Sequence, residues 1–178
     1  MQKTQPVQKK PRMLRFFLWF LLIQGVLFTI EMQRAVQNAV IEPFTASLAW
    51  ISSTLMKLFD KSIVAQGVII RSLDHPFAVK IAAGCNGVEA TIILFAALLA
   101  FPAPWKHKMW GFLLGFLAIH IANLARIITL FYIGQWNAEV FEWAHLYIWQ
   151  ALILLDVIIV WLIWVRKIPV QVTKQAAA

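Results

Sequence analysis

Four apolar runs, separated by polar segments, constrain this chain more than any other feature. They cover about residues 14–30, 88–101, 110–133 and 146–165. A helix needs about 20 apolar residues to cross the hydrocarbon core of a bilayer, and most of these runs approach that length. Hydrophobic residues make up 61% of the chain and charged residues 13%, whereas soluble domains have roughly 45–50% and about 25%. The sequence therefore predicts an all-α integral membrane protein with four transmembrane helices.

The basic residues indicate how these helices are oriented. The tail at 1–13, the loop at 102–109 and the tail at 166–178 are short and basic, whereas the loop at 134–144 has no Lys or Arg. Short basic segments stay on the cytoplasmic side of a membrane. We therefore expect two cytoplasmic tails around a membrane-embedded domain at 14–165. This topology accounts for the net charge of +8, so we expect no nucleic-acid partner.

The segment at 31–87 is too polar to span and is expected outside the cytoplasm. Its first part predicts an amphipathic helix, lying on the membrane surface or against the spans, because apolar residues recur there at spacings of three and four. These residues are Val36, Val40, Phe44, Leu48, Ile51, Leu55 and Leu58. Residues 64–70 and 77–81 are rich in strand-forming residues, and residues 73–76 have turn chemistry. The sequence predicts a short β-hairpin-like segment that leads the chain to Cys85.

Cys85 is the only cysteine in the 178 residues, within the run Gly-Cys-Asn-Gly-Val-Glu at 84–89. One cysteine excludes an internal disulfide and a multi-cysteine metal site, and no metal or organic cofactor is indicated. A buried thiol can be an inert packing group. However, Gly84 and Gly87 place Cys85 in a turn at the start of an apolar helix. Backbone N–H groups there lower a thiol pKa and can bind an oxyanion. We therefore favour a nucleophile over a structural thiol.

Two further polar residues are predicted in the same outer layer of the membrane. Arg126 lies seven residues before the outer end of the third span, and His145 precedes the fourth. A charged residue within a span has to face protein or water. Arg126 can stabilise a thiolate or a carbonyl, and it can form an ion pair with Glu89; both roles can hold together. His145 is either an interfacial histidine or a general base, and beside Cys85 and Arg126 the base is favoured.

Five polar residues have structural interpretations. Asn86 and Glu89 have the spacing of a capping box at the start of the second span. Asn123 could orient the guanidinium one helical turn further on, or bond a neighbouring helix. His120 and Asp156 lie at similar depths in the third and fourth spans. We expect a polar pair between them.

Three parts of the sequence resemble the exosortase/archaeosortase family. They are the run Ala-Gly-Cys-Asn-Gly-Val-Glu-Ala at 83–90, Asn-Leu-Ala-Arg-Ile at 123–127 and Ala-His at 144–145. The resemblance extends over about residues 14–165 and is closest to the type called exosortase H. It implies a membrane-embedded cysteine peptidase or transpeptidase. It further implies the bacterial inner membrane, with an active site that faces the periplasm.

The resemblance also implies roles for residues and partners. Cys85 would attack the substrate backbone and form an acyl-enzyme, Arg126 would stabilise negative charge or position the substrate, and His145 would move the proton. Asn86, Gly87, Glu89 and Asn123 would support this site. The substrates would be secreted proteins with a C-terminal motif, a transmembrane helix and a basic tail, within membrane lipid. The acceptor, water or another nucleophile, stays open.

Two other classes of function remain. In a non-catalytic membrane scaffold or assembly protein, an Arg126–Glu89 pair would be structural and Cys85 incidental. A small transporter would have its polar site near the middle of the membrane. His120 and Asp156 lie at that depth, but no broken helix accompanies them.

Overall fold

The computed structural model describes residues 13–168. Residues 1–12 and 169–178, which contain most of the two predicted cytoplasmic tails, lie outside the described residues. The chain forms α1 (Met13–Glu31), α2 (Arg34–Val36), the π-helical turn η1 (Gln37–Ile41), α3 (Glu42–Met56), β1 (Ile63–Gln66), β2 (Ile69–Ser72), β3 (Ala78–Lys80), α4 (Val88–Ala100), α5 (Trp105–Trp136), α6 (Ala138–Trp143), the π-helical turn η2 (Ala144–Ile148) and α7 (Trp149–Arg166).

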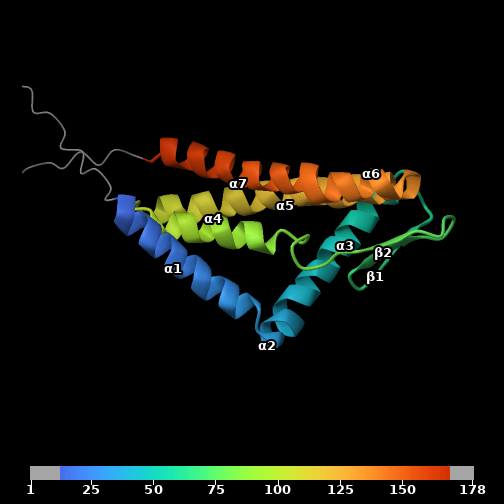
Figure 1. Cartoon of the computed structure of the whole chain (residues 1–178), viewed down its shortest axis with the longest axis horizontal. Helices are drawn as coiled ribbons and strands as arrows, with labels where there is room; N and C mark the ends of the chain where they lie inside the picture. Colours follow the sequence, from blue (N-terminus) through green and yellow to red (C-terminus); the bar gives the residue numbers. More distant parts are fainter. Residues whose placement is uncertain (1–12, 169–178) are drawn as a thin grey trace, which may run out of the picture.

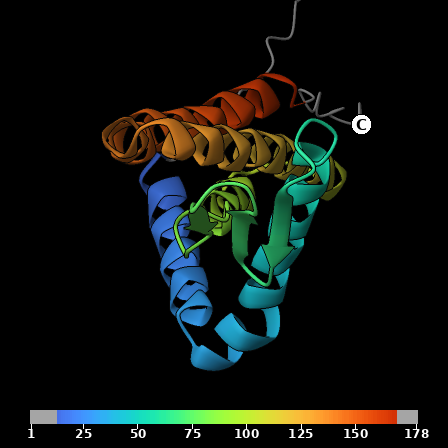
Figure 2. The same cartoon turned by 90° about the vertical axis from the view of Figure 1, so that its right-hand side faces the viewer.

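Helices α4, α5 and α7 run side by side as a bundle, and α1 packs on α4 (Figure 1). The start of α1, the end of α4, the start of α5 and the end of α7 lie at one end of this bundle. The sheet and α6 lie at the other end. Seen along the bundle, α1 and α3 diverge from their junction at α2, and the sheet lies between them (Figure 2). One end of the bundle therefore consists of helix ends alone, and the other end is capped by the sheet.

Three helices are long and apolar enough to cross a membrane: Met13–Glu31, Trp105–Trp136 and the continuous helix Ala138–Arg166. The remaining predicted span, the second, corresponds to α4, which is shorter, with 13 residues. At about 1.5 Å per residue it extends roughly 20 Å. The mainly helical architecture with a small β segment is confirmed, whereas the count of four spans stays a prediction.

Two predicted loops are largely helical. Helix α5 begins directly after Pro104, so the basic residues expected in a loop form its first turns. At the other end, the loop expected at 134–144 is reduced to a break at Asn137. The Asn137 side chain accepts hydrogen bonds from the backbone N–H groups of Glu139 and Val140, at 2.8 and 3.1 Å. Asparagine is a favoured N-cap because its oxygen satisfies such free N–H groups, and the helix restarts at once.

The predicted hairpin is instead a three-stranded antiparallel sheet of order β1-β2-β3. The run at 64–70 was expected as one strand, but Gly67 divides it with φ +57°. This left-handed conformation costs glycine little. Ile63 therefore pairs with Ser72, and Ile70 pairs with Val79 on the other side. The turn expected at 73–76 joins β2 to β3 and is confirmed.

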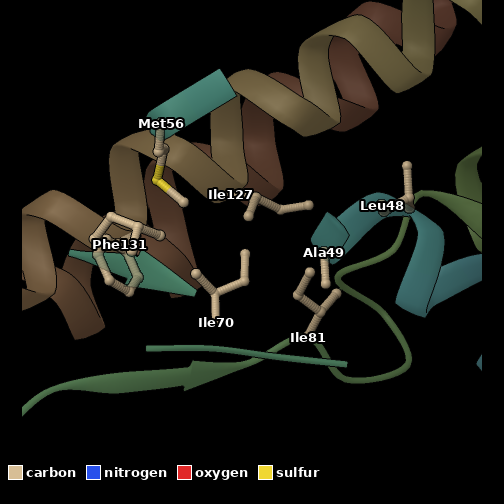
Figure 3. Packing of buried hydrophobic residues seen from close by; sticks show 8 residues of the cluster. Leu48, Ala49, Met56, Ile70, Ile81, Ile127 and Phe131 are labelled. Carbon is tan, nitrogen blue, oxygen red and sulfur yellow. The ribbon is translucent and has the colours of Figure 1, made fainter. Parts of the chain in front are cut away.

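Helix α3 packs against the sheet and α5 through part of the predicted apolar stripe. Of that stripe, Leu48 is buried, whereas Ile51 and Leu55 are exposed. The buried side contains Thr45 and Ser52 as well as apolar residues. The exposed residues are compatible with the alternative in which this helix lies on the membrane surface. Apart from Glu42, the outward side of α3 has no charge, so apolarity alone did not identify the inward side. One cluster joins α3, the sheet and α5 (Figure 3); its members are Leu48, Ala49, Met56, Ile63, Ile70, Ile81, Ile127 and Phe131.

Helices α4, α5 and α7 approach closely through small residues on α5. A Cβ atom added to Gly111 would lie 2.2 Å from the Trp164 indole nitrogen, and one on Gly115 would lie 2.4 Å from Leu94. The Trp164 indole is held in place, since it donates a hydrogen bond to the His107 carbonyl at 2.9 Å. Small residues let transmembrane helices approach in this way.

The packing at Gly111 predicts a position-specific loss of stability. We expect Gly111→Ala to lower the free energy of unfolding by about 1–3 kcal/mol, because the rigid indole cannot move away without strain. Gly25→Ala in α1 is the matched control, because a Cβ there meets nothing within 4 Å. Unfolding in mixed detergent micelles would measure both. Equal effects of the two substitutions would contradict the close packing on Trp164.

Candidate active site

Cys85 lies in the loop of residues 82–87 between β3 and α4, here called the cysteine loop. Gly84 and Gly87 have φ +83° and +78°, in the left-handed region. Gly87 is also the N-cap of α4. A Cβ on Gly87 would lie 3.2 Å from a His120 ring carbon and 3.5 Å from Asn123 Cγ. Glycine is therefore needed at 87 twice over, for its conformation and for the contact of the loop with α5.

The structure brings together Cys85, Arg126 and His145, as their positions in the sequence predict. The Cys85 Sγ is 3.5 Å from His145 Nε2. One terminal nitrogen of Arg126 donates to the same Sγ at 3.7 Å. The three side chains come from the cysteine loop, from α5 and from η2. A thiol with a histidine and a guanidinium in contact is the arrangement of an activated nucleophile.

Arg126 is almost fully buried, with 3% of its surface exposed. Within residues 13–168, its side chain has no other hydrogen bond than the one to Cys85, and its Nε is buried without a partner. The predicted ion pair with Glu89 is not formed. The Glu89 carboxylate instead accepts a hydrogen bond from the backbone N–H of Gly84. Because the chain turns tightly at Gly84, the N–H group of this residue is the donor to the Glu89 carboxylate. The Arg126 guanidinium therefore donates to Cys85 Sγ and not to Glu89.

His145 belongs to the π-helical turn η2, between α6 and α7. Such a turn inserts one residue into a helix and changes the direction of its side chains, and it is frequent at functional sites. The ring of His145 packs beside Phe141, with 5.7 Å between ring centroids. The residue type and its level along the helices could be predicted from the sequence, but the π turn that accompanies it could not.

The predicted capping box is wrong in detail. Asn86 is buried and its Oδ1 accepts from the Val88 N–H at 3.1 Å, while Gly87 takes the N-cap position. The Asn86 Nδ2 donates to Thr45 Oγ1 of α3 at 3.0 Å. Thr45 was not identified from the sequence. Its hydroxyl is one of five in α3, so it did not stand out, and nothing in the sequence placed that helix beside the cysteine loop.

Three backbone N–H groups beside the thiol already have acceptors. The Cys85 N–H donates to Ala82 O at 3.0 Å, and those of Gly84 and Val88 donate to Glu89 and Asn86. These three groups would have to break existing bonds to bind an oxyanion. The guanidinium of Arg126 already donates to Sγ, so it is a candidate donor for negative charge near Sγ.

The pKa of Cys85 is raised, opposite to the expectation from the helix start. Burial raises the pKa of the thiol, the charge of Arg126 lowers it, and the Glu89 carboxylate raises it further. Burial acts more strongly than Arg126 because the loop is covered by protein on several sides. A thiol that keeps its proton needs a base within hydrogen-bond reach, and His145 Nε2 is at that distance.

The other predicted polar contacts of α5 are not formed. Asn123 is fully buried and, among the described residues, neither its Nδ2 nor its Oδ1 has a partner. It therefore bonds neither Arg126 nor a neighbouring helix. His120 lies 3.4 Å from Thr91 Oγ1 instead of pairing with Asp156. Within residues 13–168, no three His, Cys, Asp or Glu side chains group as metal ligands.

The family comparison agrees with this geometry. A family model described as transmembrane exosortase (Exosortase_EpsH) matches residues 8–162. The chain belongs to the transmembrane exosortase family. No curated protein and no solved structure matches it. Membership confirms the family that the three motifs indicated, and it indicates a membrane protein with a role in protein sorting or processing.

The charges around Cys85 predict how its reaction with a neutral alkylating reagent depends on pH. Only the thiolate reacts, so the rate rises through the thiol pKa. For the wild type we expect a midpoint above the ordinary value of about 8.5. Arg126→Gln should move the midpoint further up, because it removes the charge that lowers the pKa. Glu89→Gln should move it down, because it removes a charge that raises the pKa.

Iodoacetamide labelling followed by intact mass would measure this profile, since Cys85 is the only cysteine of the chain. Glutamine at 89 keeps an oxygen that can accept from Gly84, so the loop conformation is retained. Arg126→Lys retains the charge and serves as the control for Arg126→Gln. Coincident profiles for all variants would show that neither charge acts on the thiol.

Proposed function

We propose that this exosortase is a membrane-embedded cysteine peptidase or transpeptidase that cleaves C-terminal sorting signals of secreted proteins. The observation that carries the proposal is the contact of one thiol with both His145 Nε2 and the Arg126 guanidinium, at 3.5 and 3.7 Å. The scaffold alternative depended on an Arg126–Glu89 ion pair. The hydrogen bond between Glu89 and Gly84 removes its main support.

Acylation begins with His145. Its Nε2 takes the Cys85 proton while Sγ attacks the carbonyl carbon of the scissile peptide bond. The negative charge that forms on the carbonyl oxygen is stabilised by Arg126, whose guanidinium already donates to Sγ. The intermediate then expels the amine of the C-terminal fragment, which receives the proton from His145 Nε2. The N-terminal part of the substrate stays on Cys85 as a thioester.

Deacylation reverses the proton transfers. An acceptor, water or an amine, attacks the thioester carbonyl while His145 takes its proton. Collapse of the second intermediate releases the N-terminal part of the substrate, and Sγ recovers its proton from His145. Water makes the reaction a hydrolysis, whereas an amine makes it a transpeptidation. Cys85 and His145 return to their starting states in both cases.

The depth of the site supports a substrate with a membrane anchor. Arg126 follows Trp105, the first residue of α5, by 21 residues, which corresponds to about 31 Å of helix. A bilayer core is about 30 Å thick. If Trp105 lies at the cytoplasmic boundary, Cys85 lies near the opposite boundary, where a substrate's transmembrane helix ends. The basic residues at the Trp105 end favour four spans, cytoplasmic termini and a periplasmic site in a bacterial inner membrane.

Co-expression tests this function directly. The substrate would be a secreted protein from the same genome with a C-terminal motif, an apolar helix and a basic tail. We expect loss of the helix and tail with wild-type enzyme and none with Cys85→Ala. His145→Ala should lower the cleavage rate by about 10²–10⁴-fold as a lost general base. Arg126→Gln should lower it by about 10²–10³-fold as a lost oxyanion donor.

Substitutions of the same residue types outside the site show whether a loss of cleavage is specific to the site. Arg71 in β2 and His75 in the turn that follows β2 are exposed and have no hydrogen bond to Cys85, so His75→Ala and Arg71→Gln should cleave like the wild type. An acid-quenched reaction should contain a covalent adduct between the enzyme and the N-terminal part of the substrate. Cleavage by Cys85→Ala at the wild-type rate would refute the thiol mechanism.

A further inference from the structure

One amide side chain connects the cysteine loop to two helices. Asn86 directly follows Cys85 and has 1% of its surface exposed. Its Nδ2 donates to Thr45 Oγ1 in α3, and its Oδ1 accepts from the Val88 N–H at the start of α4. The residue next to the thiol is therefore fixed at both ends of its side chain.

The orientation of this amide is set by Thr45. The Thr45 hydroxyl has a single proton, which it donates to the Ile41 carbonyl at 2.7 Å. The hydroxyl can then only accept from a second partner, so it requires a donor from Asn86. This fixes Nδ2 toward α3 and Oδ1 toward α4. Ile41 is the last residue of the π turn η1, so the chain of hydrogen bonds runs from that turn to the loop.

The cysteine loop needs such a constraint. It contains Gly84 and Gly87, both at positive φ, and glycine loses more conformational freedom on ordering than any other residue. The thiol has to stay between two groups at 3.5 and 3.7 Å. Misplacement of a reacting group by about 1 Å can cost about 10²-fold in rate.

We propose that Thr45 is a positioning residue, which acts through Asn86 to hold Cys85 between His145 and Arg126. This inference rests on the proposed function in one respect, that Cys85 is the nucleophile. Thr45 itself touches neither Cys85 nor a reacting atom. Helix α3 thereby becomes part of the active-site framework, in addition to its packing on the sheet.

Three threonine variants test the role of the hydroxyl. Thr45→Val keeps the shape and removes the hydroxyl, whereas Thr45→Ser keeps the hydroxyl. Thr54→Val is the matched control, since Thr54 is exposed on the same helix and its hydroxyl bonds only to the Trp50 carbonyl at 2.8 Å. We expect Thr45→Val to slow cleavage by about 10- to 100-fold. Thr45→Ser and Thr54→Val should keep the wild-type rate within about twofold.

Alkylation of Cys85 separates positioning from stability. In folded Thr45→Val, the pH profile of Cys85 alkylation should shift relative to the wild type. Adding His145→Ala to Thr45→Val should then leave the profile unchanged. Thr45→Ser should have the wild-type profile and the wild-type response to His145→Ala. If Thr45→Val lowers only the melting temperature and leaves alkylation and kcat unchanged, Thr45 is merely structural and the proposal is overturned. If Thr45→Val does not fold, Asn86→Leu, which keeps the branch at Cγ, is larger and has no polar atom, removes the same bond together with the one from the Val88 N–H.

The two proposals fail in different ways. Cleavage that survives Cys85→Ala would remove the proposed function, while the alkylation profile would still report on the Thr45–Asn86 contact. The double variant Thr45→Val, Asn86→Leu adds an independent check. If both residues act through one bond, its effect should not exceed the larger single effect by more than about twofold. A rate loss in the double variant equal to the product of the two single losses would contradict action through one bond.

Discussion

A buried guanidinium without a carboxylate partner is the constraint on which the site depends. A charged side chain that is buried in protein loses its hydration, which is costly unless a partner compensates for it. Such residues usually pair with an acidic group. In the described part of the chain, Arg126 has instead a hydrogen bond to a thiol sulfur and an unpartnered Nε. The positive charge is thus kept available to any negative charge that develops at Sγ.

The helices hold this charge beside the thiol through close backbone contacts. Gly87 brings the start of α4 against His120 and Asn123 on α5, one or two turns before Arg126. Gly115 does the same further down, against Leu94. Because α4 is held along its length, the position of the cysteine loop relative to Arg126 is set by packing. Asn86 and Thr45 then fix the loop from the opposite side.

The sequence was sufficient for features that depend on composition and order. The apolar runs gave the helices, and the positions of Cys85, Arg126 and His145 relative to those runs gave their common level. It was insufficient where short-range geometry decides between partners. Glu89 bonds Gly84 and not Arg126 because of a left-handed turn, and no residue pattern reveals which acceptor that turn favours.

The side of α3 that faces the protein was also beyond the sequence. In water, the apolar stripe of a helix faces the core, but in a membrane protein the lipid competes for the same stripe. Ile51 and Leu55 are exposed while Thr45 and Ser52 are buried. A helix of this kind needs its polar groups bonded within the protein. The hydroxyl of Thr45 meets that need with Ile41 and Asn86, whereas the hydroxyl of Ser52 has no partner among the described residues.

Burial and charge have opposite effects on the Cys85 thiol, and in the proposed mechanism their balance determines how catalysis begins. Burial raises the pKa and Arg126 lowers it, with burial the stronger. A thiol with a raised pKa favours the protonated form before a substrate arrives. In the proposed mechanism His145 would then be required for each attack, since it would take the proton as the bond between sulfur and carbon forms. Arg126 would already be beside Sγ when the carbonyl oxygen gains its charge. It would then stabilise the transition state more strongly than the resting, uncharged thiol.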